Sequence, residues 1–296
     1  MKSPALRYDP EPASPRRKLM SSSLERSFQV LEYLAARPQG QSLSALSDEL
    51  RIPRGACHRL LADLVQFGYV RQIREHGEYA LTTKLAALGL NYLSGSGIVD
   101  IAQPLMDRMA ERSGELVRLA IVDGERLTFV AKAQGAKSGL RYDPDTGTDV
   151  RLSCSAAGHA WLSTLAENEA LEIVVRQGFG SPAEFGPNAP TSVKQLVRLL
   201  QDARKRGFSM IVEMFAPGMT AMAAPIQRAG EPAVGVITIA GPLIRLTEAR
   251  MLQLGPVLKE VAAELALASA ASPILARRTP ATLADTATAP ARRSRR

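Results

Sequence analysis

The segment from Ile52 to Val70, IPRGACHRLLADLVQFGYV, constrains the fold more than any other stretch of the sequence. Pro53 suits the start of a helix, and Gly68 separates that helix from an extended, partly aromatic segment. At about 100° per residue, the apolar side chains gather on one side of the helix: Cys57, Leu60, Leu61 and Leu64. Small, cationic and hydrogen-bonding residues gather on the other side: Gly55, His58, Arg59, Ala62 and Gln66. An ordinary surface helix carries longer charged side chains there, so this narrow face is suited to lie close against another molecule.

Two further helices are predicted before this segment. Ser22 and Glu25 fit a capping box, in which Ser22 is the N-cap and Glu25 reaches back to it. The apolar stripe of the first helix is formed by Phe28, Val30, Leu31 and Leu34. A second, short helix follows Ser42, and its inward-facing residues are Leu43, Leu46 and Leu50.

A hairpin is predicted after Gly68. The stretches YVRQI and EYALT have the composition of strands, and the polar tip REHG joins them. Three helices, the last two separated by a tight turn and followed by a two-stranded hairpin, are typical of a winged helix-turn-helix. Residues 22–83 are therefore predicted to form a DNA-binding domain.

The predicted DNA contacts follow from this arrangement, because the helix over residues 53–66 would enter a major groove about 12 Å wide. The cationic and hydrogen-bonding candidates in the helix and the hairpin are Arg54, His58, Arg59, Arg71 and Arg74. A helical protein–protein module with incidental arginines is the alternative. Cys57 is interpreted as a small core residue, and His58 has no partner at metal-ligand spacing.

The net charge of +8 is carried by the two ends of the chain. Residues 1–20 hold five Lys or Arg against two Asp or Glu, and residues 272–296 hold six against one. Both ends are rich in Pro, Ala, Ser and Thr, and we expect residues 1–21 and 272–296 to be disordered basic tails. Such a tail either adds salt-sensitive attraction to phosphate or is simply solvated, so the charge alone does not identify a DNA-binding domain.

Composition argues against several classes of protein. No apolar run approaches the roughly 18 residues that cross a bilayer, and the first residues lack the apolar core of a signal peptide. Two cysteines, Cys57 and Cys154, give neither a disulfide framework nor a zinc spacing. The length of 296 residues allows two domains. We expect a cytoplasmic chain without a membrane partner, metal or cofactor.

The remainder of the chain predicts a linker helix and an α+β domain. TTKLAALGLNYLSG continues as a helix with an apolar side suited to dimer contacts, and SGSG forms a joint, so residues 84–97 are the predicted linker. Over residues 98–271 an amphipathic helix precedes a hairpin around DGE, followed by an extended stretch LRYDPDTGTDVRLS, further helices, three strands and a long closing helix. Antiparallel strands flanked by helices are typical of a sensor-like domain.

Chemistry in this second region centres on the stretch SCSAAGH. A nucleophile with its base is suggested by four residues close in sequence, Ser153, Cys154, Ser155 and His159, but no residue pattern indicates an orienting carboxylate or an oxyanion site. The common phosphate-loop, dinucleotide-binding, zinc-protease and esterase motifs are also missing. We therefore predict no catalytic residues. Small residues opening a helix, Ser155, Ala156, Ala157 and Gly158, leave backbone N–H groups free for an anion, or else they permit close helix–sheet packing.

These residues resemble a known family. SLERSFQVLEYLA, LSALSDELRIPRGACHRLLADLVQFGYV and YALTTKLAALG are similar to the winged helix-turn-helix of the isocitrate-lyase-regulator (IclR) family, and LSCSAAGHAWLS, RGFSMIVEMFAPGMTAMAAPI and ITIAGPLIRLTEAR are similar to its effector domain. The resemblance covers about residues 22–268. It implies a GAF-like effector-binding domain, homodimers or dimers of dimers, a pseudo-palindromic operator in double-stranded DNA, and control of catabolic operons by a small metabolite.

The chain departs from the family at positions that the resemblance marks as functional. Gly55 and Ala56 stand where the family commonly has Ser and Thr in the DNA-contacting first turn, so Arg54 and His58 are expected to compensate. In the effector pocket, Ile211, Ala221, Thr238 and Ala240 match an Asp, a Cys and two Ser of relatives that bind small keto acids, and Glu213 is a further candidate.

These exchanges make the predicted effector site apolar, with Thr238 keeping a hydroxyl. A two- or three-carbon acid depends on polar partners, whereas a larger, partly apolar acid, such as an aromatic one, gains from ring contacts. Arg118 or Arg141 would supply the anion contact. A ligand-modifying enzyme or a protein-interaction adaptor carrying a winged domain remains the alternative function.

Overall fold

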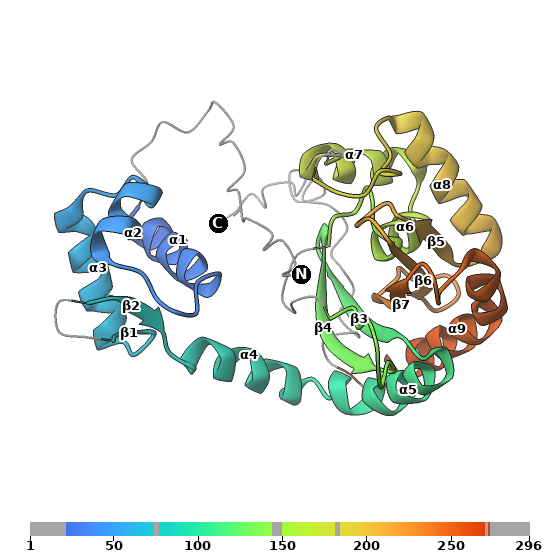
Figure 1. Ribbon diagram of the computed structural model, residues 1–296, viewed down its shortest axis with the longest axis horizontal. Coiled ribbons are helices and arrows are strands. Elements are labelled where there is room, and N and C mark those ends of the chain that lie inside the picture. Colours follow the sequence, from blue (N-terminus) through green and yellow to red (C-terminus); the bar gives the residue numbers. More distant parts are fainter. Residues whose placement is uncertain (1–21, 74–76, 144–149, 181–183, 270–271, 273–296) are drawn as a thin grey trace, which may run out of the picture. The chain divides into compact units, whose positions relative to one another are not determined.

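A computed structural model describes residues 22–73, 77–143, 150–180, 184–269 and 272 (Figure 1). The chain divides into two compact units, Met1–Tyr92 and Leu93–Arg296, and the division falls inside the predicted linker 84–97. The predicted tails, apart from Ser272, and the hairpin residues Arg74 and His76 lie outside the described residues.

In its described residues, the first unit contains three helices, a hairpin and a fourth helix that continues past the last residue of the unit, Tyr92. The three helices are α1 (Ser23–Ala35), α2 (Leu43–Leu50) and α3 (Arg54–Gln66). The hairpin is formed by the antiparallel strands β1 (Val70–Gln72) and β2 (Tyr79–Leu81). The helix that follows the hairpin is α4 (Lys84–Gly95). This is the predicted winged helix-turn-helix arrangement, with α2 and α3 separated by a tight turn.

Local hydrogen bonds explain where these helices begin and end. The Ser22 hydroxyl accepts from the N–H of Glu25, which confirms the predicted N-cap, and the Ser42 hydroxyl accepts from the N–H of Ala45 and caps the helix that was predicted to follow it. After α2, Arg51 adopts a left-handed conformation with φ of 53°, and the buried Ser47 hydroxyl donates to the Ile52 carbonyl at 2.7 Å. This turn aims α3 away from α2 while burying Ile52.

The core of the first unit confirms the predicted apolar side of α3. Its buried residues are Val30, Leu34, Leu46, Ile52, Cys57, Leu60, Leu61, Leu64, Val70 and Tyr79. The prediction for Phe28 was wrong, because its side chain is 55% exposed. Val30 and Leu34 set the inward face of α1, and Phe28 lies about 200° around the helix from Val30.

The second unit is built on one antiparallel sheet of five strands in the order β4-β3-β7-β6-β5. Its strands are β3 (Leu116–Asp123), β4 (Arg126–Gln134), β5 (Ser209–Val212), β6 (Met219–Ile226) and β7 (Gly235–Pro242). Its helices are α5 (Ile98–Ser113), α6 (Ala156–Leu162), α7 (Glu167–Gln177), α8 (Val193–Arg206) and α9 (Glu248–Ala268). The predicted α+β class and the predicted hairpin β3–β4 are confirmed.

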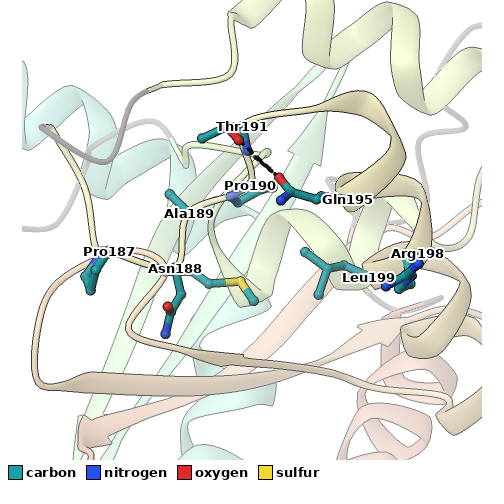
Figure 2. A pocket seen from close by; sticks show the side chains of 9 residues that line it. Pro187, Asn188, Ala189, Pro190, Thr191, Gln195, Arg198 and Leu199 are labelled. Carbon is teal, nitrogen blue, oxygen red and sulfur yellow. Dashed lines mark hydrogen bonds between the residues drawn. The ribbon is translucent and has the colours of Figure 1, made fainter.

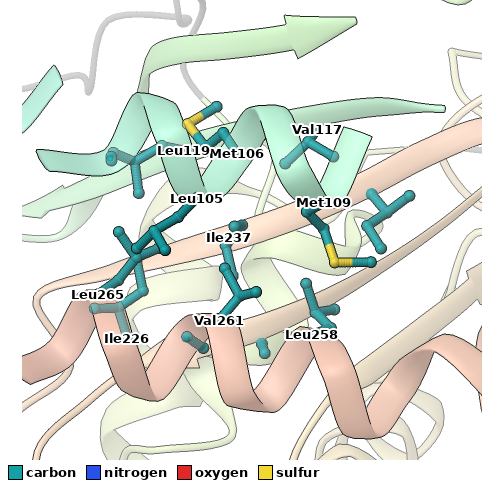
Figure 3. Packing of buried hydrophobic residues seen from close by; sticks show 14 of the residues in the cluster. Leu105, Met106, Met109, Val117, Leu119, Ile226, Ile237, Leu258, Val261 and Leu265 are labelled. Atoms are coloured by element: carbon teal, nitrogen blue, oxygen red, sulfur yellow. The ribbon is translucent and has the colours of Figure 1, made fainter. Parts of the chain in front are cut away.

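Helices cover both faces of this sheet (Figure 1). Figure 3 shows side chains of α5, among them Met106 and Met109, and of α9, among them Leu258 and Val261, gathered over residues such as Ile237 of the sheet. The other face packs against α6, α7 and α8 through Trp161, Ile173, Leu196 and their neighbours. All eight residues of β7 are buried, as expected for a central strand covered on both faces.

The stretch predicted to be extended, LRYDPDTGTDVRLS, is described only at residues 140–143 and 150–153, which form neither helix nor strand.

Among the described helices, none has by itself the length and apolar character to cross a membrane. The consecutive helices α4 and α5 meet that test only when they are taken together.

Candidate functional site

The outer face of α3 is open to solvent in the first unit. Arg54, Gly55, His58 and Arg59 are exposed and Ala56 is half-buried, whereas the four apolar residues of the helix are buried. A side chain added at Gly55 would meet open space. The structure thus brings the predicted helix residues together on one accessible face.

Cations on this surface are available to an external anion. Within the described residues, Arg54, Arg59 and Arg71 lie exposed and make no ion pair or side-chain hydrogen bond. Arg71 belongs to β1, where it stands opposite Ala80 of β2. Unpaired arginines on a groove-sized helix and on the adjoining hairpin are suited to contact phosphates and base edges.

Contacts between α3 and α4 were not predicted from the sequence. The Lys84 ammonium donates to the carbonyl of Phe67 at 2.6 Å and lies 4.5 Å from the centre of the Tyr69 ring. The Thr82 hydroxyl donates to the carbonyl of Gly68, also at 2.6 Å. The end of α3 is therefore bonded to the start of α4.

In the second unit, the four positions matched to the family's effector pocket lie on one face of the sheet. Ile211, Ala221 and Ala240 are direct neighbours across β5, β6 and β7. Thr238 precedes Ala240 by two residues and therefore faces the same side. Because Arg118 of β3 pairs with Thr238, its side chain belongs to this face as well.

The start of α6 lies over this same face. The Ser209 hydroxyl of β5 donates to the carbonyl of Ala156 at 2.6 Å, and Ser209 is in register with Ala223, which is in register with Thr238. The structure thus brings Ser155–Gly158 next to the strand positions.

Close packing accounts for part of the small-residue stretch. All seven residues of α6 are buried. A Cβ at Gly158 would approach the Leu152 carbonyl oxygen to 2.3 Å, so only glycine fits there. The Ser155 hydroxyl already accepts from the N–H of Gly158 at 3.0 Å. The alternative interpretation of this stretch, close packing, is therefore observed at Gly158, and one backbone donor is used internally.

Glu213 is committed to its own loop. It has a positive φ of 48°, its N–H donates to the carbonyl of Met219, and its carboxylate accepts from the N–H of Gly218 at 2.7 Å. The half-buried side chain closes the loop between β5 and β6, close to Ile211. One carboxylate oxygen is therefore already used in a hydrogen bond within the loop.

Arg118 is the buried cation of this face. Its side chain is 8% exposed, and its Nε atom has no hydrogen-bond partner. The guanidinium lies 3.6 Å from the centre of the Phe129 ring and 6.0 Å from that of Tyr142. Burial lowers the pKa of Arg118, and burial raises the pKa of Tyr142 against the opposing effect of the Arg118 charge. Arg141, the other predicted anion contact, is exposed.

The sequence analysis did not predict Phe129 and Tyr142 as neighbours of Arg118 at the candidate site. The signal that could have found them is Arg118 itself, a lone charge within LVRLAIV, a strand whose first six residues are all buried. A buried charge needs partners, and aromatic faces close in space are among the groups that stabilise a guanidinium.

The residues of SCSAAGH do not pair a nucleophile with a base. The His159 ring contacts the carbonyl of Ser153 through Nε2 at 2.7 Å, and burial lowers its pKa to about 4. Burial raises the pKa of the Cys154 thiol to about 12. The Ser153 hydroxyl donates to the carbonyl of Phe179. The His159 ring and the Ser153 hydroxyl each contact a backbone carbonyl, and His159 and Cys154 are neutral near pH 7. In the described part of the chain, no group of three His, Cys, Asp or Glu is placed to hold a metal ion.

A surface hollow of about 410 Å³ lies elsewhere in the second unit, and Figure 2 shows it. Its walls come from residues 187–191, from Gln195, Arg198 and Leu199 of α8, and from Met214. The N–H of Thr191 donates to Gln195 across it at 2.8 Å. None of the predicted effector residues lines this hollow, and it is wide open, so the buried sheet face is the stronger candidate site.

Comparisons with known proteins agree with this arrangement. The family described as IclR helix-turn-helix domain matches residues 23–74, and the one described as bacterial transcriptional regulator IclR C-terminal matches residues 90–267. The transcriptional repressor IclR of Escherichia coli is 28% identical over 247 residues, covering 83% of this chain and 89% of its own. The transcriptional repressor AllR of Salmonella paratyphi A is 29% identical over 267 residues, covering 90% and 97%.

Solved structures share the fold. An IclR homologue from Microbacterium hydrocarbonoxydans, solved as a complex with 4-hydroxybenzoate, superimposes with a TM-score of 0.67 at 22% identity, over 83% of this chain and 98% of that one.

Proposed function

Because the chain belongs to the IclR family of bacterial transcriptional regulators, we propose that it binds an operator through α3 and the β1–β2 hairpin, and that a small, partly apolar acid controls this binding. The observation that carries the first part is the exposed outer face of α3, where Arg54 and Arg59 have no protein partner among the described residues. Operator DNA lies on the chromosome, so the proposal places the protein in the cytoplasm.

The chemistry of the sheet face supports the second part. Ile211, Ala221 and Ala240 offer no hydrogen bond to a ligand, and Thr238 offers one hydroxyl. A keto acid of two or three carbons would lose its water contacts there and gain few in return. A ring-bearing acid gains apolar burial instead, and a structural relative is known in complex with 4-hydroxybenzoate. Residues Ser155–Gly158 and Glu213 form the proposed surroundings of this site.

The proposed mechanism is thermodynamic linkage between the two units. In a homodimer or a dimer of dimers, ligand binding favours one arrangement of the DNA-binding units. A pseudo-palindromic operator also favours one arrangement. If the two arrangements are the same, the ligand strengthens operator binding, and if they differ, the ligand weakens it. Couplings of about 1–3 kcal/mol are typical and change operator affinity about 5- to 150-fold.

The experiment that tests the DNA-binding part compares Arg59→Ala with the parent protein on duplexes from the region upstream of its own gene. We expect Arg59→Ala to lose about 5- to 100-fold in operator affinity, because one base or phosphate contact contributes about 1–3 kcal/mol. Repeating the gel shift over a range of salt concentrations separates a phosphate contact, which reduces the salt slope, from a base contact, which relaxes sequence preference.

Arg198→Ala is the matched control, because Arg198 is exposed on α8 of the other unit and its loss changes the net charge equally. Equal operator affinity of the parent and Arg59→Ala would refute the assignment of α3. Failure of the parent to bind any upstream duplex would favour the adaptor alternative, and turnover of an added ligand would favour the enzyme.

A further inference from the structure

We propose that Arg118 holds the carboxylate of the effector, with Phe129 and Tyr142 beside it, and that the effector is an aromatic monocarboxylic acid. This inference rests on the proposed function and names the ligand class of the same site. Its basis is the placement of one guanidinium: buried, next to two aromatic rings, and without an anionic partner among the described residues.

The missing partner distinguishes Arg118 from other arginines of the second unit. Arg245 meets the buried carboxylate of Glu115 through two nitrogens, at 2.6 and 2.9 Å. Arg176 meets Glu125 in the same bidentate way, at 2.9 and 2.7 Å. In the described ranges, no carboxylate lies within ion-pair distance of Arg118, although it is more buried than either. A cation removed from water without a counter-ion is unfavourable, and an anionic ligand would remove that cost.

The surroundings of Arg118 fit a ring. Its guanidinium carbon lies 3.6 Å from the centre of the Phe129 ring, and the Tyr142 side chain is a hydrogen-bond partner. The buried Nε–H has no partner and is available to donate to a carboxylate. Thr238, its direct neighbour on β7, adds a hydroxyl whose protein contact, to the Arg118 carbonyl, is long at 3.4 Å. Beyond Thr238 the face continues with Ala240 and Ala221, which are small and apolar.

The charge of the site fits a single negative charge. Lys132, the neighbour of Arg118 on β4, is paired with Asp143 at 2.6 Å and is partly exposed. Arg151, before α6, donates to the carbonyl of Gln177 at 2.7 Å. Arg118 meets the Phe129 ring and the Tyr142 side chain but no carboxylate among the described residues, and its single charge would balance a monocarboxylate better than a phosphate ester or a dicarboxylate.

The test is calorimetric titration of the full chain with benzoate, 4-hydroxybenzoate, benzamide and pyruvate. Benzamide keeps the ring and the shape of benzoate but has no charge. We expect the parent protein to bind at least one of the two aromatic acids at least tenfold more tightly than benzamide or pyruvate, since a charge-assisted hydrogen bond has about that effect. Arg118→Met should reduce the affinity for that acid at least tenfold, to the level of benzamide.

Arg141→Met is the matched control, because Arg141 is exposed on the segment that also carries Tyr142. It should bind the acids as the parent does. Circular dichroism and thermal melting check that Arg118→Met folds; because that variant removes an unpaired buried charge and keeps an apolar stem, its melting temperature without ligand should equal or exceed that of the parent.

Three results would overturn the inference: equal affinity of Arg118→Met and the parent for the acid, equal affinity of the parent for benzoate and benzamide, or no binding of either aromatic acid by the parent. Operator binding by the ligand-free parent, measured in parallel, keeps this failure apart from failure of the proposed function. Should the parent bind operator DNA and ignore the aromatic acids, only the ligand assignment is wrong.

Discussion

Two buried basic residues of the second unit, His159 and Arg118, differ in whether their side chains carry a charge. His159 stays neutral and contacts a backbone carbonyl, so burial costs it little. Arg118 cannot lose its proton near neutral pH and remains a cation beside aromatic rings. The first is a structural group, and the second carries the proposed ligand contact.

His159 predicts a defined dependence of stability on pH. Its pKa is about 4 in the folded protein against an ordinary value of 6.5, so only the unfolded chain takes up its proton as the pH falls between these values. Stability should therefore be constant with respect to this group above about pH 6.5 and decline below it, by about 2 kcal/mol at pH 5.

Urea unfolding of the parent and of His159→Gln at pH 7.5 and 5.0 checks this prediction. Glutamine retains a donor for the Ser153 carbonyl but does not titrate, so the variant should lose most of the difference between the two pH values. His58→Gln serves as the control on an exposed histidine of α3. An unchanged pH dependence in His159→Gln would show that another group causes it.

Single residues also mark the limit of prediction from this sequence. The buried face of α3 could be predicted because helical periodicity alone determines it, and Cys57 and the three leucines lie where that periodicity places them. The choice between Arg118 and Arg141 could not be made, because it depends on strand register and on which segment passes over Phe129. Neither is encoded in local spacing.

At the scale of elements, α3 shows what the exchange of Ser-Thr for Gly55-Ala56 changes. In the first turn of this helix Gly55 is exposed and Ala56 is half-buried against the core of the first unit, and the N-cap, Pro53, makes no side-chain hydrogen bond to the helix. The backbone geometry of the helix is intact without the hydroxyls. At position 55 the exchange therefore removes a donor at the surface and not a structural contact.

Gly55→Ser should increase operator affinity. The new side chain meets open space, adds a donor on the DNA-facing surface and improves helix propensity by about 0.5 kcal/mol. One added hydrogen bond predicts a gain of about 2- to 10-fold, measurable by fluorescence anisotropy with a labelled operator duplex.

Gly89→Ser supplies the comparison, because Gly89 lies within α4 and its added side chain also meets open space. It should gain in helix propensity without a gain in affinity. If both variants bind operator equally tightly, the hydroxyl at position 55 contributes nothing.

Elements differ in how well the sequence predicts them. The cap at Ser22, the helix that follows Ser42 and the turn between β3 and β4 follow local rules and were predicted. The position of Phe28 was not, because the inward face of α1 depends on α3 and β2, which contact Val30 and Leu34. The start of α6 had two interpretations, and only its contact with Leu152 revealed the close packing at Gly158.

At the scale of the whole molecule, the proposed regulation has a reciprocal form. If the aromatic acid weakens operator binding by some factor, operator DNA must weaken binding of the acid by the same factor. We expect calorimetric titration of benzoate into the protein, with and without saturating operator duplex, to give dissociation constants whose ratio equals the shift seen in the gel assay. A ligand affinity independent of DNA, alongside a clear gel response, would contradict linkage between the two sites.

The bonds from Thr82 and Lys84 to the end of α3 have a practical consequence for building hybrid regulators. Lys84 begins α4 yet holds the carbonyl of Phe67, and α4 beyond it buries no residue. A junction placed before residue 82 would separate α3 from the groups that fix its last turn. A junction placed after Lys84 keeps them together, so a foreign ligand-sensing domain should be fused within the exposed part of α4.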